Sequence, residues 1–129
     1  KEYDILIDSD SKYLTLNYVR KFLIPNKVQG VSFYSKNDNE YIIFNRSYGR
    51  DVNSVMQIFK YSPNILNYND NKLNSVIVEC PSMLEQSTMI DDEMYSTYES
   101  AALPYETDNS FPNFGVIDMD EIVKKLELY

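Results

Sequence analysis

The stretch Val28–Asn45, with the sequence VQGVSFYSKNDNEYIIFN, decides how this chain can fold. β-branched and aromatic residues are frequent on both sides of its middle, and such residues favour extended strands. The middle itself, Asn37-Asp38-Asn39, is typical of a tight turn. The stretch therefore predicts a β-hairpin with strands at Val28–Ser35 and Tyr41–Asn45.

On each side of this hairpin the sequence predicts one helix and one strand. Before it, Tyr3–Ile7 is typical of a short strand, and apolar residues at helical spacing predict a helix over 13–23. After it, a similar spacing predicts a helix over 52–59, and Leu73–Glu79 is typical of another strand. The order strand, helix, strand, strand, helix, strand predicts an α+β fold, a ferredoxin-like antiparallel sheet over residues 1–80.

The rest of the chain, residues 81–129, is predicted to be an acidic, helical extension packed on that core within one domain over 1–129. Met, Leu and Tyr residues between Met83 and Tyr98 fit one face of a helix. Asp118 is placed to cap a last helix, because an aspartate before an apolar periodic segment accepts hydrogen bonds from its first turn.

Charge divides the chain in the same way. Residues 1–72 carry a net charge of +2, residues 73–129 carry −10, and the whole chain carries −8. A surface this negative repels phosphate backbones and attracts basic proteins, so direct nucleic-acid binding is not expected. The charge indicates that a partner, if there is one, is a basic protein.

Several kinds of chemistry lack their usual residues. There is no histidine, which removes the commonest general base and metal ligand. Cys80 is the single cysteine, so the chain forms no internal disulfide and no multi-cysteine zinc site. No apolar stretch is long enough to span a membrane. We therefore expect a cytoplasmic protein with no cofactor and no membrane contact, and no catalytic residues are assigned.

One pattern supports an alternative, enzymatic function. Apolar residues run into paired aspartates twice, at Asp8 and Asp10 and again at Asp118 and Asp120. An Asp-x-Asp at the end of a strand can hold Mg²⁺ for phosphoryl transfer. Over the six residues 5–10, this pattern resembles the start of haloacid-dehalogenase-type phosphatases, which implies the same chemistry. The other interpretation is that both pairs lie at helix starts, where aspartate caps backbone N–H groups.

Acids interleaved with Met and Tyr in the extension predict a protein-binding surface. The acids would provide electrostatic attraction and the large side chains most of the affinity. The predicted partner-binding residues are Glu85, Asp91, Asp92, Glu93, Met94, Tyr95, Tyr98, Glu99 and Glu106.

The sequence thus favours a non-catalytic protein-interaction domain. Its sharper form is an acidic inhibitor, of the immunity-protein or nucleic-acid-mimic kind, that covers a basic site on its partner. A third alternative is a structural subunit of a larger assembly or a homo-oligomer, with Met and Tyr residues of the extension buried against a neighbour.

Overall fold

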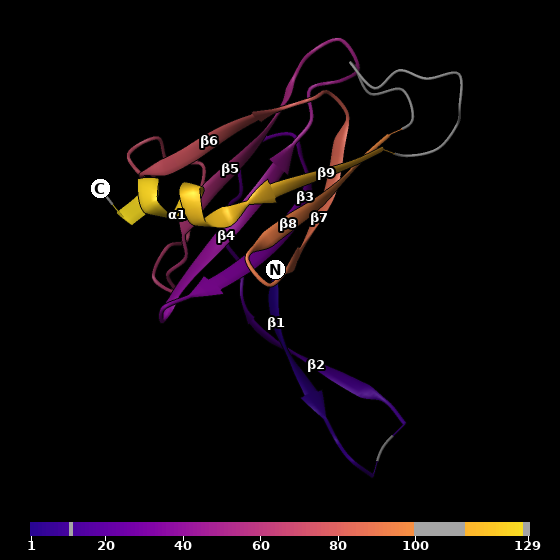
Figure 1. Ribbon diagram of the computed structural model, residues 1–129. Helices are drawn as coiled ribbons and strands as arrows, with labels where there is room; N and C mark the ends of the chain where they lie inside the picture. Colours follow the sequence, from indigo (N-terminus) through magenta and orange to yellow (C-terminus); the bar gives the residue numbers. More distant parts are fainter. Residues whose placement is uncertain (11, 100–112, 128–129) are drawn as a thin grey trace.

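The computed structural model describes residues 1–10, 12–99 and 113–127, and these residues form nine strands and one helix (Figure 1). The elements are β1 (Glu2–Ile7), β2 (Leu14–Arg20), β3 (Val28–Lys36), β4 (Asn39–Arg46), β5 (Ser54–Lys60), β6 (Ser75–Cys80), β7 (Leu84–Ile90), β8 (Glu93–Tyr98), β9 (Asn113–Asp118) and α1 (Met119–Glu127). The strands pair antiparallel in three groups. These are the two-stranded ribbon β1–β2, a four-stranded sheet in the order β3-β4-β5-β6 and a three-stranded sheet in the order β7-β8-β9.

The ferredoxin-like prediction is wrong, because both helices expected within residues 1–80 are strands. The segment 13–23 contains β2, in which Leu14, Leu16 and Tyr18 alternate with polar residues at the period of a strand. The segment 52–59 contains most of β5, which is covered on both faces of its sheet. A strand buried on both faces is a continuous apolar run, and such a run satisfies helical spacing as readily as strand spacing.

The described part of the extension, residues 81–99 and 113–127, is likewise not mainly helical. Its Met- and Tyr-rich part forms the hairpin β7–β8, which β9 extends to a three-stranded sheet. Only the last predicted helix is confirmed, as α1, and the Asp118 carboxylate accepts a hydrogen bond from the Asp120 backbone N–H at 2.9 Å. The β3–β4 hairpin is also confirmed, with positive φ angles of 51° and 62° at Asn37 and Asp38, as a tight two-residue hairpin turn requires.

Two apolar clusters lie on opposite faces of the four-stranded sheet. The larger cluster, which includes Ile43, Met56 and Met119, lies between this sheet, the three-stranded sheet and α1. The smaller cluster includes Ile42, Phe44 and Tyr68 and is covered by the loops that precede β3 and follow β5. Because both faces are covered, every residue of 41–45 in β4 is buried.

Small and polar side chains join the two larger sheets where β3 passes β7. The Ser32 hydroxyl donates to the Ser87 carbonyl at 2.6 Å, and the Asn45 amide donates to the Glu85 carbonyl at 3.0 Å and to the Ser87 hydroxyl at 2.6 Å. Gly30 lies at the closest approach, where an added Cβ would be 2.6 Å from the Glu85 carbonyl oxygen. The sheets can approach this closely because Gly30 has no side chain and because Ser32, Ser87 and the Asn45 amide nitrogen are hydrogen-bonded across the contact.

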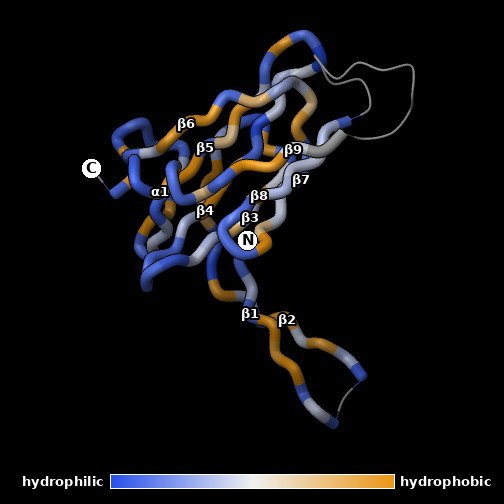
Figure 2. Tube along the Cα trace, in the orientation of Figure 1, coloured by the Kyte–Doolittle hydropathy of each residue, from blue (hydrophilic) through white to orange (hydrophobic). Residues whose placement is uncertain are grey.

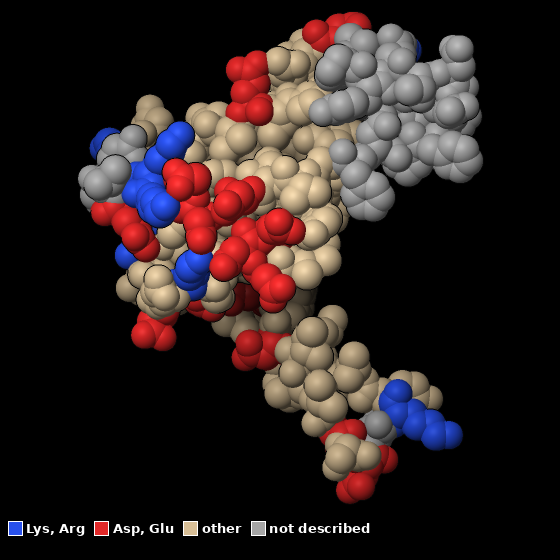
Figure 3. All heavy atoms as spheres, in the orientation of Figure 1, with Lys and Arg blue, Asp and Glu red and all other residues tan. Residues whose placement is uncertain are grey.

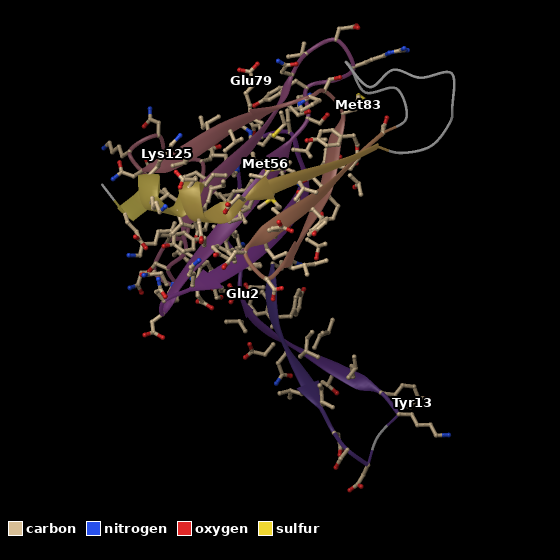
Figure 4. All side chains as sticks on the ribbon, viewed as in Figure 1. Glu2, Tyr13, Met56, Glu79, Met83 and Lys125 are labelled. Atoms are coloured by element: carbon tan, nitrogen blue, oxygen red, sulfur yellow. The ribbon has the colours of Figure 1, made fainter. Side chains whose placement is uncertain are left out.

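The ribbon β1–β2 projects from this body as an arm, which we define as residues 2–20. Figure 1 shows it leaving the two packed sheets with only its root against them, and Figure 2 shows that its strands are largely apolar. In Figure 4, Glu2 lies where the arm leaves the body and Tyr13 lies at the far tip. Among the described residues, no helix is both long enough and apolar enough to cross a membrane.

Candidate interaction surfaces

The arm carries an apolar face that the body does not cover. In its ladder, Tyr3 pairs with Tyr18, Ile5 with Leu16 and Ile7 with Leu14, so these side chains share one face. They are between 42% and 79% exposed. The opposite face is mixed, since Asp4 pairs with Asn17 and Leu6 with Thr15. We call the set Tyr3, Ile5, Ile7, Leu14, Leu16 and Tyr18 the apolar face.

A group of polar contacts at the root, the root clamp, fixes the arm to the body. The Arg20 guanidinium donates to the Glu2 carboxylate at 2.7 Å, to the Tyr61 hydroxyl at 2.5 Å and to the Pro63 carbonyl. It also lies over the rings of Phe22 and Tyr61, 5.4 and 5.2 Å from their centroids. The Tyr61 hydroxyl donates to Glu2 in turn, at 3.0 Å. These contacts hold both strands of the arm against the loop after β5.

The clamp also sets the ionisation of its members. The hydrogen bond from Arg20 lowers the pKa of Glu2, and the same bond raises the pKa of Arg20. Burial is the main cause that raises the pKa of Tyr61. Glu2 and Arg20 therefore stay ionised at neutral pH and the clamp holds, so the arm is presented in a defined direction.

A cavity of about 420 Å³ lies at the root beside the clamp. Its lining is mostly apolar, and Tyr3 belongs both to this lining and to the apolar face. The apolar face therefore continues into the cavity. The lining residues of this root cavity are Lys1, Glu2, Tyr3, Phe22, Ile24, Val31, Phe33 and Phe44.

A second surface gathers acids from the β7–β8 turn, the end of β9 and the first turn of α1. The Met119 backbone N–H donates to the Asp92 carbonyl at 3.0 Å, and this bond joins the turn to the start of the helix. Glu93 and Asp118 are opposite each other in the ladder. Figure 3 shows the resulting concentration of red atoms on one side of the body. We call Asp91, Asp92, Glu93, Asp118, Asp120 and Glu121 the acidic face.

Lys36 of β3 partly neutralises this face, and Tyr34 of the same strand donates a hydrogen bond to it. The Lys36 ammonium lies 3.2 Å from the Asp92 carboxylate and also contacts Asp120. The Tyr34 hydroxyl donates to Asp92 at 2.6 Å. These bonds lower the pKa of Asp92, the bond to Asp120 raises the pKa of Lys36, and burial together with Asp92 raises the pKa of Tyr34 to about 12. Asp92 thus stays ionised at neutral pH.

The residues predicted to bind a partner do not form one surface. Asp91, Asp92 and Glu93 belong to the acidic face, whereas Glu85 and Glu99 lie together at the other end of the β7–β8 hairpin. Burial, with the Glu99 carboxylate nearby, raises the pKa of Glu85.

The predicted anchors and the last predicted acid are placed differently. Met94 and Tyr98 are buried in the larger core cluster, so they cannot act as surface anchors. Tyr95 is half-buried and donates its hydroxyl hydrogen bond to Glu93 at 2.8 Å. Glu106 lies outside the described residues.

The structure does not bring the two aspartate pairs together. Asp8 and Asp10 lie at the tip of the arm, where the Asp8 carboxylate accepts from the Asp10 backbone N–H at 3.0 Å. Asp118 and Asp120 lie at the start of α1, far from that tip (Figure 1). Across residues 1–10, 12–99 and 113–127, no three His, Cys, Asp or Glu side chains are grouped to hold a metal ion. The two aspartate pairs therefore do not belong to one common site.

The arm is the surface that the sequence analysis missed. Its signal is present in Leu14–Tyr18, where apolar and polar residues alternate, and in the run Tyr3–Ile7 that pairs with it. The turn between them, rich in Asp and Ser, is typical of a hairpin loop. That alternation predicts a ribbon with one apolar face, but it does not indicate that the face is left uncovered.

No family model, no curated protein and no solved structure matches this chain.

Proposed function

We propose that this chain is a non-catalytic protein-binding subunit of an assembly, and that it docks through the apolar face of the arm. The observation that carries the proposal is the exposure of six large apolar side chains on one face of a projecting ribbon. Contiguous exposed apolar surface of this kind marks interaction sites on soluble proteins.

The stability of the arm supports the same function. An isolated two-stranded ribbon is only marginally stable in water, because its single layer buries little apolar surface. Among the described residues, the body contacts this ribbon near its root, through Arg20 and the cavity lining. A partner that covered the apolar face would supply the missing layer, and the root clamp would hold the arm ready for it.

A photo-crosslinking amino acid placed at Leu16, on the apolar face, tests this function in the cells that produce the protein. We expect a covalent adduct to a polypeptide, because Leu16 would lie within the interface. The matched control is the same group at Thr15, on the opposite face one residue away, where adducts should be few. Absence of any polypeptide adduct at Leu16, or an adduct to lipid instead, would contradict the proposal.

The acidic face supports a second candidate function, binding to a basic protein. The observation that favours it is that Glu93 and Asp118 are opposite each other in the β8–β9 ladder. Like charges in such a cross-strand pair repel, and a cationic partner would relieve this repulsion. An inhibitor that covers a basic site would use this surface rather than the arm.

Neutralising this face tests the second candidate. The triple variant Asp91→Asn, Asp92→Asn and Glu93→Gln should be eluted from immobilised polylysine at lower salt than the wild type, because three adjacent charges are lost. The matched control neutralises three exposed acids elsewhere, Glu40, Asp51 and Glu79. Equal shifts for both triple variants would show that only net charge matters, which contradicts a dedicated acidic face.

A further inference from the structure

We propose that the partner of the apolar face is a second copy of this chain, and that two arms pack face to face and antiparallel, each tip reaching the root cavity of the other copy. This inference rests on the proposed function and names its partner. A two-fold axis across the middle of the arms relates the copies, so both contribute the same surface.

The area of the surface is sufficient for such a dimer. With the exposed parts of Ile24, Val31 and Phe33 at the root, the apolar face presents on the order of 1,000 Å², and a standard interface takes about 800 Å² from each partner. No charged side chain lies on this face. Two copies can therefore oppose it without placing like charges together, as two apolar sheet faces pack in a sandwich.

Charge at the two ends of the arm selects the antiparallel arrangement. The tip carries Asp8 and Asp10 with Lys12, a net charge of −1. The root carries Lys1 and Lys21 against Asp4, a net charge of +1, because Glu2 and Arg20 neutralise each other. Antiparallel arms place the acidic tip of one copy beside the basic root of the other. Parallel arms would place tip against tip and would also bring together two bodies of a chain with a net charge of −8.

The geometry of the arm also allows its tip to reach the other root. Strands of six and seven residues extend roughly 20 Å, and Tyr3 joins the apolar face to the cavity at one end of that length. Ile7 lies at the other end and is 79% exposed, so it is the side chain placed to enter the root cavity of the partner copy. The same contact forms twice in the dimer.

Sedimentation of the full chain from nanomolar to high micromolar concentration tests the inference. We expect a monomer–dimer equilibrium in the wild type. The variant Ile5→Glu with Leu16→Glu should weaken the dimer more than tenfold, because it places four carboxylates in the interface. The control Leu6→Glu with Thr15→Glu puts the same charges on the neighbouring cross-strand pair of the opposite face, and it should change the dimer dissociation constant by less than about threefold.

A charge exchange tests the antiparallel arrangement. The tip variant Asp8→Lys with Asp10→Lys and the root variant Lys1→Glu with Lys21→Glu should each weaken their own dimers by about tenfold. An equimolar mixture should restore the wild-type affinity, because the tip of each variant then meets a root of opposite charge. Weakening without restoration would overturn the antiparallel arrangement.

The crosslinking experiment at Leu16 separates this inference from the proposed function. An adduct to a different polypeptide, together with a monomer at every concentration, overturns the second copy as partner and leaves the proposed function standing. Absence of any adduct overturns both. An adduct of twice the chain mass supports both.

Discussion

Replacement of Gly30 by alanine is expected to destabilise the fold by about 3 kcal/mol or more, which is a large part of the stability of a small domain. The added Cβ would lie 2.6 Å from the Glu85 carbonyl oxygen and 3.1 Å from the Gln86 Cα. These are backbone atoms of β7, so β7 itself must move away from β3. That movement also strains the bonds from Ser32 to Ser87 and from Asn45 to Glu85.

Chemical denaturation of Gly30→Ala beside Ser35→Ala, an exposed position on the same strand, measures the effect. A second variant separates the cause. The Gln86 side chain is also close to the added Cβ, so Gly30→Ala combined with Gln86→Ala removes that contact and keeps the backbone one. We expect the double variant to remain destabilised. Recovery to within 1 kcal/mol of Gln86→Ala alone would contradict close backbone approach as the cause.

Replacement of Met94 by alanine is expected to lower the free energy of unfolding by about 2–5 kcal/mol, the range for emptying a large side chain from a packed core. Met94 is 0% exposed and lies in the larger cluster between the two sheets. The sequence pattern instead predicts a surface anchor at Met94, for which truncation would weaken binding and leave stability almost unchanged. The two interpretations therefore predict opposite results.

Val116→Ala is the matched control, because Val116 is on the adjacent strand β9 and is 55% exposed. We expect it to change the free energy of unfolding by about 0.5 kcal/mol or less, as is usual at exposed positions. Thermal or denaturant unfolding of both variants gives the comparison. A stable Met94→Ala protein with impaired dimer formation would contradict the buried position.

Local chemistry explains which elements the sequence could predict. The β3–β4 hairpin depends on two neighbouring strands and on residues that accept positive φ at Asn37 and Asp38. The last helix depends on a cap at Asp118 and on an apolar stripe, Ile122, Val123 and Leu126, that remains buried in the fold. Such signals lie within a few residues, so neighbouring structure does not change their meaning.

The wrong helices have a different origin. The sequence of β5 fits helical spacing because apolar side chains lie on both faces of this strand. Both faces are apolar because the two clusters cover opposite sides of the sheet. The β7–β8 hairpin depends on a two-residue turn, Asp91 and Asp92, between Ile90 and Glu93. In the sequence alone, these two acids indicate a charged surface rather than a turn. They serve both as a turn and as part of the acidic face.

By itself, the sequence determined that the back half of the chain is strongly negative, that histidine chemistry is absent, and where a hairpin and a capped helix form. Tertiary structure alone decided which apolar residues are covered. Met94 and Tyr98 are buried because β8 packs against the four-stranded sheet, whereas Ile5 and Leu16 stay exposed because the arm leaves the body. Burial depends on contacts between segments distant in sequence, and a local pattern of apolar residues cannot specify those contacts.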